Sequence, residues 1–180
     1  MAVEGMKSIN GRFLAGALLA VVPLAAGAEV RLAQADAMLI EHRFTIAAPA
    51  EKAWESLVHP ELWWPEDHTW SGDRRSLSLA PVAGGCYCER WHDSSAEHGR
   101  VVMAVPRRLL TLNAALGPFL EMAISGILSI KLEEQAGVTT AVVTYRVSGD
   151  AAHKLDQLAP IVDQVLGMQF GNFAAHAGQP

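Results

Sequence analysis

The chain has 180 residues, of which 51 % are apolar and 18 % are charged. This composition supports one sizeable core, and the length favours a single domain and argues against disorder. Fourteen Lys and Arg residues stand against 19 Asp and Glu residues, giving a net charge of −5 without a long basic run, so nucleic acid is not an expected partner. Two cysteines are too few for a disulfide framework or a four-cysteine zinc site.

The first 28 residues have the three parts of a secretory signal. Lys7 and Arg12 precede an apolar stretch at 13–24, and a small-residue exit follows at 26–28. The apolar stretch is short and interrupted by glycine and proline, so it does not make a comfortable bilayer span. We therefore predict a signal peptide at 1–28, cleavage after Ala28, and an exported, periplasmic or secreted, acidic product. The alternative is a retained membrane anchor, which no second apolar span supports.

Residues 29–180 contain no repeat or linker and are predicted to form a single domain. Alternating residues predict a first strand at 39–46, whose apolar face includes His42. Pro49 then starts a short amphipathic helix that ends at Val58. A second short helical turn at 61–64 ends at Pro65 and leads into a polar loop.

The region from Arg74 to Ser148 is typical of an antiparallel meander, because short alternating runs are separated by turn residues. The last element is an amphipathic helix at 160–175, placed to begin at Pro160 because proline is tolerated in the first turn of a helix. The six predicted strands of the meander are 75–79, 85–91, 97–105, 109–113, 125–133 and 139–147.

Together these elements predict an α+β fold in which a curved, seven-stranded antiparallel sheet wraps on a long C-terminal helix, with two short helices after the first strand. The sheet has one apolar face, and a single long helix packed across that face would bury it. Such a helix-grip arrangement leaves room for a cavity lined by apolar and aromatic side chains.

Several segments carry a resemblance to a known family: the run 45–54, the pair Trp63 and Trp64, the glycines at 84–85 and the run 106–110. The chain resembles the START-like (SRPBCC) superfamily of Bet v1-like helix-grip proteins. Within it, the runs 68–73, 85–89, 97–98 and 116–118 resemble the bacterial polyketide cyclase/dehydrase-like or activator-of-Hsp90-ATPase-like branch.

The resemblance extends from about Met38 to Phe173 and rests on fold markers more than on catalytic motifs. It implies a hydrophobic cavity that binds a small apolar or aromatic molecule. It does not imply binding to Hsp90, because an exported protein does not meet a cytosolic chaperone.

Aromatic residues gather where this architecture opens its pocket. Trp63, Trp64 and Trp70 surround a glycine-containing loop, and flat aromatic faces suit the capture of a ring or an acyl chain. The alternative is that these side chains only close one end of the core. The candidate ligand-binding residues are Trp63, Trp64, Trp70, Tyr87, Trp91, Met103, Phe119, Met122, Val165, Met168 and Phe170.

His98, Glu89 and His42 are the candidates for proton transfer. If Glu89 faces the cavity, burial should raise its pKa; the favoured alternative is an edge salt bridge to an arginine such as Arg100. His98 shares its strand face with Arg100 and is placed toward solvent, and a lone histidine on an apolar face, as His42 is, is more often a core residue than a catalyst.

Two functions are compatible with these residues. The favoured one is a non-enzymatic domain that binds a small apolar molecule, because spacing does not force any pair of titratable residues together. The alternative is a cyclase- or hydratase-like enzyme acting on an apolar substrate in the cavity. Motifs for nucleotide binding or proteolysis are absent from the sequence. The sequence carries no pattern specific to an oligomeric state.

Cys86 and Cys88 stand two residues apart on one predicted strand. The regular strand spacing of about 6.5 to 7 Å disfavours a disulfide between them, so we expect reduced, buried structural thiols. The alternative is a soft-metal site completed by a histidine. Its candidate ligands are His98, His92, His68 and His42. We predict neither a bound metal nor a cofactor.

Overall fold

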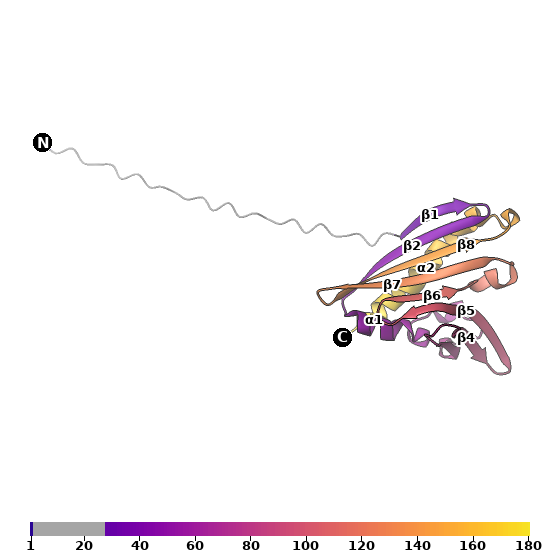
Figure 1. The fold of residues 1–180 in the computed structure, drawn as a ribbon, viewed down its shortest axis with the longest axis horizontal. Coiled ribbons are helices and arrows are strands. Elements are labelled where there is room, and N and C mark those ends of the chain that lie inside the picture. Colours follow the sequence, from indigo (N-terminus) through magenta and orange to yellow (C-terminus); the bar gives the residue numbers. More distant parts are fainter. Residues whose placement is uncertain (2–27) are drawn as a thin grey trace.

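The computed structural model describes Met1 and residues 28–180, so the predicted signal peptide lies outside the described residues except at its two ends. Residues 28–180 form a curved antiparallel sheet with the strand order β1-β2-β8-β7-β6-β5-β4-β3, and the long helix α2 lies across one face of it (Figure 1). This arrangement confirms the predicted helix-grip architecture.

The seven predicted strands are all present, and the sheet has an additional edge strand, β1. The strands are β1 (Ala28–Gln34), β2 (Ala37–Ile46), β3 (Leu77–Leu79), β4 (Cys86–Trp91), β5 (Ser94–Val105), β6 (Leu109–Asn113), β7 (Ser125–Gln135) and β8 (Val138–Ser148). The helices are α1 (Ala50–Leu57) and α2 (Leu155–Ala177), with short 3-10 helices at Pro60–Leu62, Glu66–His68, Arg74–Ser76, Gly117–Glu121 and Ala151–His153.

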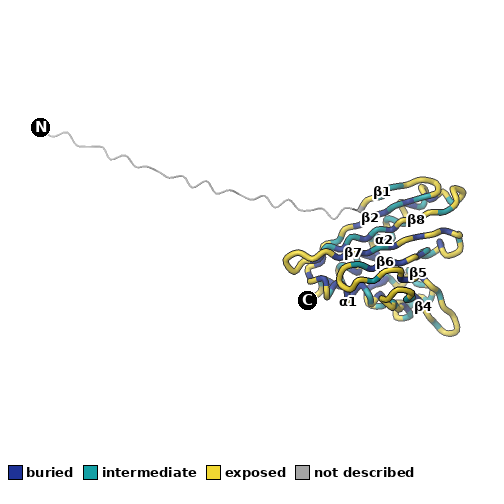
Figure 2. Tube along the Cα trace, in the orientation of Figure 1, coloured by how far each residue is buried: buried dark blue, intermediate teal, exposed yellow. Residues whose placement is uncertain are grey.

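The pairing of β2 with β8 joins strands that are far apart in the chain. β2 pairs with β8 along its whole length, from Ala37 opposite Ser148 to Ile46 opposite Thr139. Alternate residues of both strands are buried against α2, as the period of two requires for a sheet with one covered face. Figure 2 shows this core in dark blue, with the exposed residues in the turns and outer edges.

Helix α2 begins at Leu155, five residues before the predicted start, and Pro160 lies inside it. The prediction was wrong because tertiary contacts stabilise the extra turn: Leu155 and Ala159 are fully buried, and the Leu155 amide donates to the Ala35 carbonyl at 2.9 Å. Pro160 lies only one turn into the helix and removes a single backbone hydrogen bond there. Within the described part of the chain, no helix is both long and apolar enough to cross a bilayer.

Strand β5 contains two irregularities that decide where its side chains point. The pairing with β4 shifts between Tyr87 and Cys88, so that His98 is the extra residue of β5 at this step. The pairing with β6 shifts between Val101 and Met103. Each β-bulge adds one residue to the strand and changes the face on which the following side chains lie.

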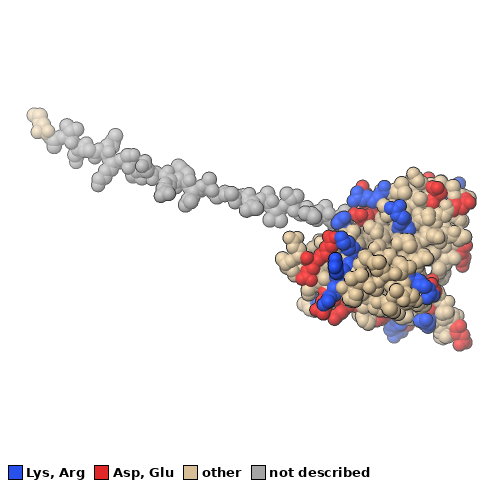
Figure 3. Space-filling view, viewed as in Figure 1, with Lys and Arg blue, Asp and Glu red and all other residues tan. Residues whose placement is uncertain are grey.

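Charged side chains are interspersed over the visible surface. Figure 3 shows Lys and Arg side chains close to Asp and Glu side chains on the face displayed, without a continuous basic area. This mixture is typical of a solvent-exposed protein surface and does not resemble the basic stripe that binds a phosphate backbone.

Candidate functional site

An aromatic cluster occupies the core between the sheet and α2. Trp63 contacts Trp64 and Phe170 with ring centroids 5.4 and 5.8 Å apart, and Trp64 meets the edge of Tyr87 at 5.6 Å. All four rings are buried, and they line a cavity of about 20 Å³. The cavity is about the size of one water molecule. The aliphatic residues around it are Leu57, Pro60, Leu79, Leu110, Leu112, Leu128 and Ile130.

Trp63, Trp64, Tyr87 and Phe170 are therefore the predicted ligand-binding residues that the fold brings together. The others do not line this cavity. Phe119 is buried, but it lies in the 3-10 helix Gly117–Glu121. Three others are partly buried: Trp91, Met122 and Val165. The last three are exposed: Trp70 (49 %), Met103 (50 %) and Met168 (40 %).

Two of these placements have clear geometric causes. The β5 irregularity after Val101 leaves Met103 opposite Thr111 on the outer face of the sheet. Met168 lies two positions from Phe170, about 200° around the helix, so the two side chains cannot face the same surface.

Tyr87 has a buried hydroxyl group without a hydrogen-bond partner among the described residues. Tyr145 is equally buried, but its hydroxyl donates to the Ala114 carbonyl at 3.0 Å and accepts from the Leu116 amide at 3.1 Å. Burial, together with the nearby charge of Glu89, raises the pKa of Tyr87 well above its ordinary value. The Tyr87 hydroxyl thus stays protonated and is free to bond with a group placed beside it.

Glu89 lies on the same inward face as Tyr87 and is fully buried. Its carboxylate accepts hydrogen bonds from the backbone amides of Trp70, at 3.1 Å, and Ser71, and from Nε2 of His98 at 2.9 Å. Burial raises the pKa of Glu89, but the hydrogen bonds from Ser71, Trp70 and His98 together bring it below its ordinary value. Glu89 is therefore an ionised carboxylate that anchors the Trp70–Ser71 loop to the sheet.

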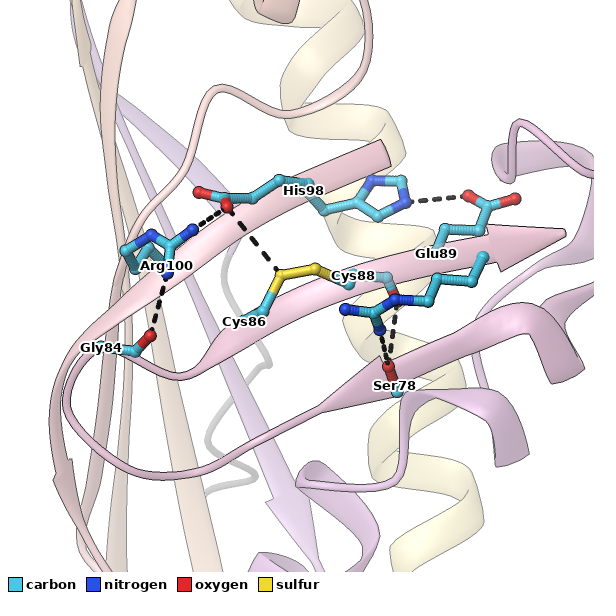
Figure 4. The surroundings of a disulfide bond; sticks show 9 residues. Ser78, Gly84, Cys86, Cys88, Glu89, His98 and Arg100 are labelled. Atoms are coloured by element: carbon cyan, nitrogen blue, oxygen red, sulfur yellow. Dashed lines mark hydrogen bonds and ion pairs between the residues drawn. A yellow bond between two sulfur atoms is a disulfide. The ribbon is translucent and has the colours of Figure 1, made fainter. Parts of the chain in front are cut away.

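This arrangement corrects three expectations. An inward-facing Glu89 was expected to have a raised pKa, and the opposite holds because three donors compensate for its burial. The alternative salt bridge to Arg100 is not formed, since Arg100 pairs with Glu97. His98 was placed toward solvent, but it is 3 % exposed, because the extra residue in β5 turns its ring toward Glu89 (Figure 4).

Tyr87, Glu89 and His98 together form what we call the inner polar cluster. The Tyr87 and His98 rings are 5.0 Å apart, and the His98 imidazole bonds to Glu89. The backbone amides of Trp70 and Ser71 complete the cluster. They could not have been predicted from the sequence, because every residue except proline has a backbone amide.

His42 is not part of this cluster. Its Nε2 lies 2.9 Å from Oδ1 of Asp163 on α2, although the two groups are not aligned for a hydrogen bond. Its ring stacks on Phe44 at 5.8 Å. His42 therefore packs β2 against α2.

Cys86 and Cys88 form a disulfide, so the expectation of reduced thiols was wrong (Figure 4). The reason is the local shape of β4: the Cα atoms are 5.4 Å apart, closer than in a regular strand and within the range that a disulfide spans. The contraction lies where the β4–β5 pairing shifts.

The histidines considered as metal ligands are dispersed. His92 is exposed in the β4–β5 turn, and His68 contacts Asp67 at 3.0 Å. Among residues 28–180, no three His, Cys, Asp or Glu side chains come together as a set that could hold a metal ion.

Comparison with known proteins gives structural matches only. No protein-family model and no curated protein matches the sequence. CalU16 from Micromonospora echinospora matches with a TM-score of 0.57 and 15 % identity over 87 % of this chain and 86 % of that one. A protein from Rhizobium leguminosarum matches with a TM-score of 0.58 and 16 % identity over 79 % and 95 %.

The third match gives the clearest link to the resemblance in the sequence. The di-domain ARO/CYC StfQ of the steffimycin biosynthetic pathway matches with a TM-score of 0.55 and 12 % identity, over 79 % of this chain and 51 % of StfQ. The chain has the START-like (SRPBCC) helix-grip fold. At these identities, the START-like matches establish the fold and leave the ligand to be argued from the site.

Proposed function

We propose that residues 29–180 form an exported START-like domain that binds one small, ring-bearing molecule between α2 and the sheet. The observation that carries this proposal is the unpartnered Tyr87 hydroxyl beside an aromatic-lined cavity. A buried hydroxyl without a partner costs about 1 to 3 kcal/mol. A ligand with one polar group would remove that cost while its ring packs against Trp64 and Phe170.

The volume of the cavity restricts how such a ligand enters. A space of about 20 Å³ does not hold an aromatic ring, so side chains around it must move on binding. Trp63 and Trp64 lie in the segment Pro60–Ser76, which consists of short 3-10 helices and turns. The backbone hydrogen bonds of this segment are local turn bonds without strand pairing, so we expect the part around Trp63 and Trp64 to move when the ligand enters, while Glu89 holds the Trp70–Ser71 loop.

Two observations support an extracytoplasmic location. The sequence of residues 1–28 has the form of a secretory signal, and disulfides such as Cys86–Cys88 form in oxidising compartments. Cleavage after Ala28 would leave strand β1 intact from Glu29 onward.

The inner polar cluster favours binding over the alternative of a cyclase- or hydratase-like enzyme. A general acid at Glu89 would need a raised pKa, whereas the pKa of Glu89 is lowered and its oxygens are occupied by Trp70, Ser71 and His98. Glu89 thus holds the loop and the imidazole in place, and Tyr87 is the polar group left to meet a ligand.

A pair of probes tests the proposal. 2-Naphthol and naphthalene have the same rings and differ by one hydroxyl. We expect both to quench tryptophan emission, with 2-naphthol binding about fivefold more tightly because it bonds to Tyr87. Tyr87→Phe should bind both probes with equal affinity, whereas Met103→Ala, on the exposed outer face, should keep the preference. Absence of binding by either probe, in titration and in native mass spectrometry, would show that the interior is not a ligand site.

A further inference from the structure

The Cys86–Cys88 disulfide closes a loop of only three residues. Disulfides stabilise proteins mainly by restricting the unfolded chain, and this effect grows with loop length. A bond across one intervening residue therefore adds little to stability, although it fixes the backbone locally. That intervening residue is Tyr87, which the proposed function places against the ligand.

The two sulfur atoms have different surroundings. Cys86 is partly exposed at the start of β4, and Cys88 is 7 % exposed. Sγ of Cys86 lies 4.0 Å from Oε2 of Glu97, which pairs with the exposed Arg100. Figure 4 shows Arg100 and Gly84 at the Cys86 end of the disulfide and His98 and Glu89 on the side of Cys88. An external reagent thus reaches Cys86 before Cys88.

We propose that the Cys86–Cys88 disulfide is a thiol-exchange site for a dithiol and that its redox state sets the position of Tyr87. A thiolate of the dithiol attacks Sγ of Cys86, the Cys86–Cys88 bond breaks, and its electron pair passes to Sγ of Cys88, which takes up a proton from water. The second thiol of the dithiol then loses its proton to water and attacks the dithiol's own sulfur in the mixed disulfide, and Cys86 leaves with the electron pair and takes up a proton. The dithiol leaves oxidised by two electrons, and the protein keeps both thiols.

Glu97 supports the reduced state. Once Cys86 is released as a thiol, its S–H has a carboxylate acceptor already in place at Oε2 of Glu97. Arg100 stays paired with that carboxylate and with the Gly84 carbonyl, which holds this end of the site in position.

Reduction changes the backbone on which Tyr87 stands. With the bond closed, the Cα atoms of Cys86 and Cys88 are 5.4 Å apart, and a relaxed strand spans about 6.6 Å over two residues. Strand β4 is therefore free to lengthen once the bond opens, and we expect Tyr87 then to move relative to Trp64 and His98, its two aromatic neighbours. The effect on ligand affinity rests on the proposed function, whereas the exchange reaction does not.

The experiment uses the folded chain and dithiothreitol. The oxidised protein is incubated with increasing concentrations of dithiothreitol without denaturant. The reaction is quenched with acid, free thiols are alkylated, and the intact mass is measured by mass spectrometry. We expect both cysteines to become alkylated while far-UV circular dichroism stays native. A short pulse with a radioactive or mass-labelled monothiol should place the mixed disulfide on the peptide at Cys86. Reduction that requires denaturant, or label found mainly on Cys88, would overturn the exchange site.

The position of Tyr87 is measured on the same samples. We expect reduction to change the near-ultraviolet circular dichroism of the aromatic cluster and to weaken 2-naphthol binding about threefold or more. The matched Cys86→Ala/Cys88→Ala variant should show no response to dithiothreitol. Reduction without either change would overturn the link to Tyr87. If the spectrum changes but neither form binds 2-naphthol or naphthalene, the exchange site stands and the proposed binding function fails.

Discussion

Glu89 is a fully buried carboxylate whose charge is balanced by two backbone amides and one imidazole. Because its pKa is lowered in the folded state, it contributes stability above its ordinary pKa of 4.5, and this contribution is lost as the pH falls through the folded value. Protonation of Glu89 at low pH should therefore weaken the hydrogen bonds that hold the Trp70–Ser71 loop on the sheet.

We predict that Glu89→Gln lowers the free energy of unfolding at pH 7 by about 2 to 4 kcal/mol, because a glutamine cannot accept all three hydrogen bonds as an ion does. The difference between wild type and variant should shrink as the pH falls below about 4.5. Urea unfolding at several pH values measures both quantities.

A matched control is Glu97→Gln on the neighbouring strand. The Glu97 side chain is 44 % exposed, so its loss should cost less than about 1 kcal/mol. A Glu89→Gln variant as stable as this control at pH 7 would show that the buried carboxylate is not what holds the loop.

Helix α2 carries two glycines one turn apart that face the same strand with different clearances. A Cβ at Gly167 would lie 3.0 Å from Cε1 of His42, whereas a Cβ at Gly171 would meet Phe44 at 4.0 Å, an ordinary contact. The His42 ring has little freedom to move, because it lies between Asp163 and Phe44. The helix can therefore accept a methyl group at the second position and not at the first.

We predict opposite effects on thermal unfolding for these two glycines. Gly171→Ala should stabilise the protein by up to about 1 kcal/mol through helix propensity. Gly167→Ala should destabilise it by about 1 to 3 kcal/mol, because the helix must move away from β2. If Gly167→Ala were at least as stable as Gly171→Ala, the close packing of His42 against α2 would be disproved.

The elements that the sequence predicted well are those with one face buried along their whole length. In β7 and β8, Leu128, Ile130, Val143 and Tyr145 alternate with exposed or half-buried residues, so a period of two is visible without any structure. Val30 and Leu32 alternate in the same way in β1, but this edge strand follows directly on the predicted signal peptide and was not assigned.

The details of the site depend on features that no residue pattern marks. The β-bulges of β5 turn His98 inward and Met103 outward, and a bulge adds one residue without a required residue type. The disulfide was missed for the same reason, because the regular strand spacing used for Cys86 and Cys88 does not hold beside a bulge.

At the scale of the whole molecule, removal of residues 1–28 changes the charge as well as the length. This segment contains Lys7, Arg12 and Glu4, so the net charge would change from −5 to −6. We predict that the intact mass of protein recovered from the extracytoplasmic fraction corresponds to a chain starting at Glu29. Recovery of only the full-length chain from the cytoplasm would contradict export; replacing Leu18 and Leu19 by arginine should block it.

The pairing of β2 with β8 also bears on when the protein can fold. Ala37 meets Ser148 across the sheet, so this ladder joins residues near the two ends of the domain, and α2 covers it from still further along the chain. A nascent chain that crosses a membrane N-terminus first delivers β2 long before its partner strand arrives. Such long-range contacts form slowly, after the intervening loop has closed. If the chain is exported N-terminus first, as we propose, β2 therefore waits without its partner strand until nearly all of the domain has crossed.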